Sequence, residues 1–181
     1  GDDDLYGDDG VDTIRGGLGD DFINGGFGNN KLFGDEGNDI LLGHSGHDQM
    51  EGGIGADLLS GGAGNDLLRG GLGDDVLIGG IHNDRLYGDE GSDLIFAANI
   101  SQTATYQLLR LHDDWSDGRA YFTRRNTLRN GTSTTFKQRV SYTGIVGYDA
   151  NPDQVFGGDG KDWIFAGANE VREDDGDDIE S

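Results

Sequence analysis

The chain has 181 residues, of which 35 are Gly, one is Pro and none is Cys, and its 35 acidic against 13 basic residues give a net charge of −22. Only 33% of the residues are hydrophobic, a composition typical of disordered chains. This charge argues against nucleic acid as a partner, because phosphates would be repelled, and favours cations. Disulfides and thiolate metal sites are excluded, and no apolar run approaches the roughly 18 residues of a membrane span.

A nine-residue repeat organises the first half. Ten nonapeptides follow one another without insertion from Gly7 to Phe96, and residues 1–6 match the end of an eleventh. Position 1 is Gly in all ten, position 4 is Gly in nine, position 6 is Asp in nine, and position 8 is always Ile, Leu or Met. Because the pattern is already under way at Gly1, we expect the chain to be a piece of a longer protein.

The period predicts a flattened solenoid. Positions 7 to 9 alternate as a short strand does, with the apolar residue at position 8 facing inward. Positions 1 to 6 are too rich in Gly for a helix or a strand and predict a turn, in which Gly supplies positive φ angles. Two nonapeptides would form one coil, and five coils would stack over about 24 Å. This thin core cannot offset the ordering entropy of so many glycines, so something else must stabilise the fold.

The carboxylates at position 6 indicate what else stabilises the fold. Those of repeats n and n+2 would lie on the same edge of the solenoid, in columns of like charge roughly 5 Å apart. A hard divalent cation between coils would remove the repulsion, and carboxylate and carbonyl oxygens suit Ca²⁺ better than Mg²⁺ or a soft metal. The alternative for these aspartates is Asx-turn hydrogen bonding without a metal. A zinc pair at His44 and His47 is less favoured than a role as exposed turn residues.

The segment Gly52-Gly53-Ile54-Gly55-Ala56-Asp57-Leu58-Leu59-Ser60 resembles the RTX (repeat-in-toxin) nonapeptide G-G-x-G-x-D-x-U-x, and the resemblance covers residues 1–96 without a gap. It implies an all-β fold, a right-handed parallel β-roll stacked on calcium, in a protein exported by type I secretion to the cell surface or the medium. It also implies a ligand scheme. Each ion would take the carbonyls of positions 2 and 4 and the Asp of position 6 from one turn, and the carbonyls of positions 1 and 3 and the Asp of position 6 from the turn 18 residues on.

Carried over to this sequence, the scheme gives eight complete pairings in residues 1–96, hence about eight ions, with the count at the C-terminal repeats left open. The position 6 ligands are Asp3, Asp12, Asp21, Asn30, Asp39, Asp48, Asp57, Asp66, Asp75, Asp84 and Asp93, with Asp162 in a later repeat. The residues proposed to ligate through their carbonyls are Gly17, Gly19, Gly34, Glu36, Asp35, Gly37, Gly52, Ile54, Gly53, Gly55, Gly70, Leu72, Gly71, Gly73, Gly88, Glu90, Gly46, Gly61, Ala63, Gly62, Gly64, Gly79 and Ile81.

Three departures from the repeat bear on this scheme. Asn30 removes a charge from two neighbouring sites. His82, at position 4, must adopt backbone angles that Gly takes freely. Asp at position 2, found at Asp8, Asp35 and Asp89, is harmless because only its carbonyl would ligate.

The second half leaves the period and rejoins it. We divide the chain into a β-roll over residues 1–96, a small mixed α/β capping insertion over 97–147, and returning repeats with an acidic end over 148–181. Asp117 as an N-cap, followed by Tyr121, Arg125 and Leu128 on one face, predicts a short helix in the insertion. The repeat returns at 148–156 and 157–165, with Asp153 and Asp162 at position 6.

This half also resembles the C-terminal flank of some large bacterial RTX surface proteins, which implies a cap closing the roll. Residues 97–156 carry seven Lys or Arg against five Asp, a net +2, and the arginines are read as a surface that neutralises the acidic roll. The aromatic residues are interpreted as the core of the cap, and the alternative is an aromatic–Arg patch that binds a glycan or a protein. These aromatic residues are Trp115, Tyr121, Phe122, Phe136 and Trp163.

No catalytic motif accompanies the repeats: G-x-S-x-G and H-E-x-x-H are absent from the sequence, and we expect no enzyme activity. The sequence therefore predicts a calcium-binding module that folds outside the cell. One alternative is a structural subunit of a filament, surface layer or adhesin that forms homo-oligomers by end-to-end stacking. The other is the C-terminal tail of a secreted protease or lipase.

Overall fold

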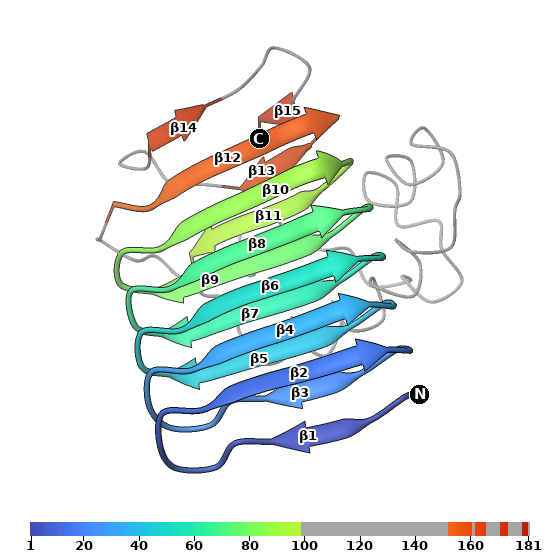
Figure 1. Ribbon diagram of the computed structural model, residues 1–181. Coiled ribbons are helices and arrows are strands. Elements are labelled where there is room, and N and C mark those ends of the chain that lie inside the picture. Colours follow the sequence, from blue (N-terminus) through green and yellow to red (C-terminus); the bar gives the residue numbers. More distant parts are fainter. Residues whose placement is uncertain (99–151, 161, 166–170, 174–178, 181) are drawn as a thin grey trace, which may run out of the picture.

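Parallel strands wind into a flattened solenoid in the computed structural model of the chain (Figure 1). The structure describes residues 1–98, 152–160, 162–165, 171–173 and 179–180. This part of the chain is all-β and contains no helix, so it offers no apolar helix long enough to cross a membrane. The short helix, the aromatic residues and the arginines expected between 99 and 151 lie outside the described residues.

Two parallel sheets form the broad faces of the solenoid. The odd sheet contains, in spatial order, β1 (Asp4–Tyr6), β3 (Phe22–Asn24), β5 (Ile40–Ser45), β7 (Leu58–Ala63), β9 (Val76–Ile81), β11 (Leu94–Ala98), β13 (Trp163–Phe165) and β15 (Ile179–Glu180). The even sheet contains β2 (Thr13–Leu18), β4 (Lys31–Glu36), β6 (Gln49–Ile54), β8 (Leu67–Leu72), β10 (Arg85–Gly91), β12 (Gln154–Gly160) and β14 (Val171–Glu173).

The register confirms that two nonapeptides make one coil. In the even sheet Leu32 lies opposite Met50, and Met50 lies opposite Leu68, so paired residues are 18 apart. The side chains at position 8 point inward and form one continuous core between the sheets, as the repeat predicts. The core consists of Ile23, Leu32, Leu41, Met50, Leu59, Leu68, Leu77, Leu86, Ile95, Ala97, Val155 and Ile164, with Leu5 and Ile14 packed against it.

Ten of the fifteen strands in the described residues are longer than the three residues predicted. β4, for example, spans Lys31–Glu36, because Asp35 and Glu36, at positions 2 and 3, also pair in parallel register with Gly53 and Ile54. Glycine therefore does not end the strand at position 1. The backbone continues past it with a local interruption of the ladder, and the turn is confined to the residues around positions 4 to 6.

Glycine serves two different purposes in the repeat, of which the sequence predicted one. Positions 2 and 4 have positive φ, and the side chains found there accept this strain: Asp35 has a φ of 74° and His82 a φ of 89°. Position 1 is different, because its glycines have no positive φ and only lack of space explains them. A Cβ on Gly52 would lie 2.3 Å from the Oδ2 of Asp57 and 2.7 Å from the carbonyl oxygen of Gly70.

The returning repeats stack directly on the coil that precedes the insertion. Leu86 of β10 lies opposite Val155 of β12, and Ile95 of β11 lies opposite Ile164 of β13. Residues 69 apart in the chain are therefore paired here in the same parallel register as residues 18 apart in the earlier coils. The edges of β10 and β11 were expected to be closed by the capping insertion, and they are instead paired with β12 and β13. A cap at that point is not needed to satisfy their backbone groups.

The outer faces of the two sheets differ. On the odd sheet the outward positions of β7, β9 and β11 carry apolar side chains that are buried, among them Leu58, Val76 and Leu94. On the even sheet an arginine side chain contacts an aromatic ring and a carboxylate that belong to the next coil. The Arg69 guanidinium lies 4.6 Å from the Tyr87 ring centroid and 3.2 Å from Asp89, and Tyr87 stacks on Phe156 at 4.5 Å.

Candidate metal centre

The side chains at position 6 form two columns, one along each edge of the solenoid. Their members succeed one another by one coil, and all except Asp3 and Asp12 are buried, with at most 2% of their surface exposed. One column holds Asp3, Asp21, Asp39, Asp57, Asp75, Asp93 and Asp162, and the other Asp12, Asn30, Asp48, Asp66, Asp84 and Asp153. Asp153 and Asp162 extend the columns across the insertion, as their position in the returning repeats predicts.

From Asp21 and Asn30 onward, one oxygen of each column side chain accepts a hydrogen bond from the preceding coil. The backbone N–H of Asp39 donates to the Oδ1 of Asp57 at 2.8 Å, and the N–H of Asp57 donates to the Oδ1 of Asp75 at 2.8 Å. Bonds of this kind link every successive pair in both columns, with lengths of 2.7 to 3.0 Å. Each Oδ1 therefore faces back toward the previous coil.

The second oxygen is buried and accepts no hydrogen bond. This holds for the Oδ2 atoms of Asp12, Asp21, Asp39, Asp48, Asp57, Asp66, Asp75 and Asp93. A buried, charged oxygen without a partner is costly, and a repeated row of such atoms calls for a shared compensating charge. The metal-free alternative of Asx hydrogen bonding therefore accounts for Oδ1 and leaves Oδ2 unexplained.

Glycine at position 1 keeps a space open beside each Oδ2. At Gly34 the place that a Cβ would occupy lies 2.2 Å from the Oδ2 of Asp39 and 2.5 Å from the carbonyl oxygen of Gly52. A carboxylate oxygen and the position 1 carbonyl of the next coil thus approach the same small volume. Both oxygens are ligands that the scheme assigns to the Asp39–Asp57 pairing.

The remaining carbonyls between the coils of Asp39 and Asp57 also point in the directions that the scheme requires. The carbonyls of Asp35 and Gly37, at positions 2 and 4, point toward the following coil, where they would meet a Cβ on Gly53 or Gly55 at 2.1 and 1.8 Å. The carbonyl of Ile54, at position 3 of that coil, points back and accepts the N–H of Gly37 at 2.9 Å. Oxygens of both coils therefore face the gap between them.

Burial raises the pKa values of the column carboxyl groups. Removal from water, and next the charge of Asp57, raise the pKa of Asp75 to about 8. Burial likewise raises the pKa of Asp57 to about 7, against the opposing hydrogen bond from the Asp39 backbone. The pKa of Asp39 rises to about 6 for the same main reason. A bound cation would favour the charged form and so reverse these shifts.

The donor set is made of hard oxygen atoms. Within the described residues no three His, Asp or Glu side chains gather as a metal cluster, so the carboxylates would need main-chain carbonyls to complete a coordination shell. Flexible coordination by six to eight oxygens is the preference of Ca²⁺. The zinc alternative at His47 finds no support, because its Nδ1 already accepts the N–H of Asn65 at 2.8 Å.

Position 5 carries a second ladder that we did not predict. The N–H of Asn38 donates to the Oδ1 of Asp20 at 2.8 Å, and the N–H of Ala56 donates to the Oδ1 of Asn38 at 2.9 Å. These bonds run opposite to those at position 6, because the acceptor lies in the earlier coil. The available signal was composition, since eight of the ten repeats carry a side chain there that can accept a hydrogen bond: Asp20, Asn29, Asn38, His47, Asn65, Asp74, Asn83 and Ser92.

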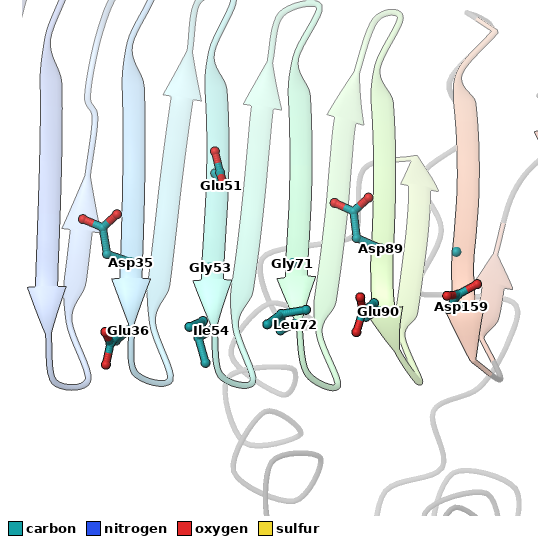
Figure 2. A pocket seen from close by; sticks show the side chains of 11 residues that line it. Asp35, Glu36, Glu51, Gly53, Ile54, Gly71, Leu72, Asp89, Glu90 and Asp159 are labelled. Carbon is teal, nitrogen blue, oxygen red and sulfur yellow. The ribbon is translucent and has the colours of Figure 1, made fainter.

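A shallow groove crosses the outer face of the even sheet, away from both columns. Figure 2 shows carboxylates at its two ends, with Ile54, Leu72 and the carboxylate of Glu51 between them, whereas Gly53 and Gly71 contribute no side chain. The residues that line it include no Ser, His or Lys. The groove therefore offers neither a hydroxyl nor an imidazole or amine nucleophile. Its lining consists of Asp35, Glu36, Glu51, Gly53, Ile54, Gly71, Leu72, Asp89, Glu90, Gly158 and Asp159.

Comparison with known proteins agrees with the geometry of the columns. The family model of the RTX calcium-binding nonapeptide repeat matches four times, at residues 1–32, 24–59, 60–95 and 149–170. A search of curated proteins found no match. The family matches span most of the chain and include the returning repeats that stack on β10 and β11. With its 18-residue coils, its two carboxylate columns and these matches, the chain belongs to the RTX calcium-binding nonapeptide repeat family.

Proposed function

We propose that this chain is a calcium-dependent folding module of a secreted bacterial protein, unfolded in the calcium-poor cell and folded in the calcium-rich medium. The observation that carries the proposal is the row of buried Oδ2 atoms without hydrogen bonds, each beside the space that a position 1 glycine keeps open. Family membership supports calcium as the ion. The module is structural, and we assign it no catalytic step.

The ligands follow the pairing of coils. Between the coils of Asp39 and Asp57, the two carboxylates would share an ion with the carbonyls of Asp35, Gly37, Gly52 and Ile54. Residues 1–96 contain eight such pairings, and the carboxylates of Asp153 and Asp162 extend each column by one further pairing. The bound ions would supply positive charge between carboxylates that the fold has removed from water.

Far-UV circular dichroism tests the proposal. In a calcium chelator we expect a disordered spectrum, and calcium should convert it cooperatively into a β spectrum. Magnesium at the same concentration is the control and should have much less effect, because it demands stricter octahedral geometry and retains its waters. A β spectrum of full amplitude in the chelator would refute a calcium requirement for folding.

A further inference from the structure

Asn30 is the one residue other than Asp in the two columns, and it takes the same place as its neighbours. Only 1% of its surface is exposed. Its Oδ1 accepts the N–H of Asp12 at 3.0 Å, and its own N–H donates to the Oδ1 of Asp48 at 2.7 Å. The inter-coil ladder thus runs through Asn30 without a break, and this fixes the orientation of the amide.

With Oδ1 turned back toward Asp12, the amide nitrogen lies beside Gly25 and Gly28 of its own repeat. Nδ2 lies 2.9 Å from the place that a Cβ on Gly25 would occupy, where the aspartates put Oδ2. It donates to the carbonyl oxygen of Gly28 at 3.2 Å. The amide group of Asn30 therefore has partners for both of its polar atoms, whereas the aspartates on either side of it, Asp12 and Asp48, have a buried Oδ2 that accepts no hydrogen bond.

The two pairings that include Asn30 are consequently unequal. Gly28 holds position 4 of its repeat, so its carbonyl is a proposed ligand between the coils of Asn30 and Asp48. A cation there would meet a hydrogen-bond donor in place of an anionic oxygen, and this donor bonds the proposed ligand carbonyl of Gly28 itself. Between the coils of Asp12 and Asn30 the facing atom is Oδ1, and a neutral amide oxygen is an ordinary calcium ligand.

We propose that the Asn30 side-chain amide replaces the metal ion between the coils of Asn30 and Asp48. The junction between these two coils is then held by hydrogen bonds alone, whereas the Asp12–Asn30 pairing keeps its ion. The inference rests on the proposed function and makes it more specific, since seven of the eight pairings in residues 1–96 would take calcium. The columns are thus not uniform ion ladders, because one coil junction forms without calcium.

Calcium content per chain tests this inference, measured after equilibrium dialysis at saturating calcium on the whole chain. Asn30→Asp restores the missing oxygen and should bind one ion more than the unaltered protein. Asp39→Asn is the matched control in the opposite column, where the new amide would face the carbonyl of Gly37. It should bind one ion fewer. Circular dichroism in calcium establishes that each variant is folded.

The outcomes separate the inference from the proposed function. No gain for a folded Asn30→Asp protein would overturn the inference, and so would a gain of two ions, since both Asn30 pairings would then have been empty. An unaltered protein that binds no calcium would instead refute the proposed function. If Asn30→Asp does not fold, anomalous scattering from crystals of the unaltered protein with calcium decides directly, because an ion between Asn30 and Asp48 contradicts the inference.

Discussion

Asp75→Asn should have opposite effects on stability with and without calcium. Asp75 lies near the middle of its column, with 0% of its surface exposed. Asparagine has the same shape and keeps the Oδ1 that accepts the N–H of Asp57 at 2.8 Å. The substitution therefore removes a buried negative charge and the oxygen that faces the next coil, and leaves the backbone ladder intact.

The magnitude follows from the pKa of this group. Folding without metal raises the pKa of Asp75 from 3.8 to about 8. Each tenfold change in a protonation equilibrium corresponds to about 1.4 kcal/mol, so keeping this carboxylate charged above pH 8 costs the folded chain on the order of 5 kcal/mol. Asp75→Asn removes that cost, and the variant without calcium should fold more readily by several kcal/mol. In calcium it should need more ion to fold, because it has lost a ligand oxygen and a charge.

Folding in a chelator at pH 8.5 can be driven with trimethylamine N-oxide, an osmolyte that favours burial, and followed by circular dichroism. We expect Asp75→Asn to fold at a lower osmolyte concentration than the unaltered protein. Asp74→Asn is the control, because it changes the net charge equally at the adjacent, half-buried position and keeps the acceptor for the Ser92 N–H. Equal shifts for the two variants would refute the argument from burial and leave only a general charge effect.

Three further outcomes are expected. The osmolyte concentration that folds the chelated protein should rise between pH 4 and pH 8, because the column groups bind protons more tightly when folded, with pKa values of about 6 for Asp39 and about 8 for Asp75 against 3.8 unfolded; a flat profile would contradict these shifts. Gly52→Ala should lower the melting temperature in calcium by the equivalent of at least 1–3 kcal/mol, since its Cβ would lie 2.3 Å from the Asp57 Oδ2, whereas Gly1→Ala, with nothing within 4 Å, should be silent. His82→Gly should raise the melting temperature by the equivalent of about 1 kcal/mol by relieving a φ of 89°, and a decrease would show that the His82 side chain matters more than the strain.

The repeat was sufficient to predict the coil and the columns because both depend on period alone. A recurrence of nine residues with one inward position fixes which side chains share the core, and doubling it fixes which carboxylates follow one another along an edge. Residues such as Leu59 and Asp57 therefore lie where the sequence places them. The return of the period after the insertion assigned Asp153 and Asp162 to position 6, with Asp162 predicted as a ligand, and both side chains join the columns.

Composition could not distinguish the two reasons for glycine. Position 2 has a positive φ and carries Asp35 and His44, whereas position 1 has no positive φ and its glycine is explained by crowding alone, because the position 6 side chain lies beside it. The second reason depends on contacts that form only in the folded chain. The same limit explains why most strands were predicted too short and why the position 5 ladder was missed.

The sequence by itself determined the fold class, the two edges and the chemistry of hard oxygen atoms, since a strict period and a strong negative charge leave few alternatives. Only the tertiary structure decided how each carboxylate divides its oxygens, with Oδ1 turned back to a backbone N–H and Oδ2 left beside a glycine. It also decided that Asn30 places a hydrogen-bond donor where the aspartates have Oδ2. The physical reason is that hydrogen bonds between coils orient these side chains, and a sequence shows which residues recur but not which atom of each faces which coil.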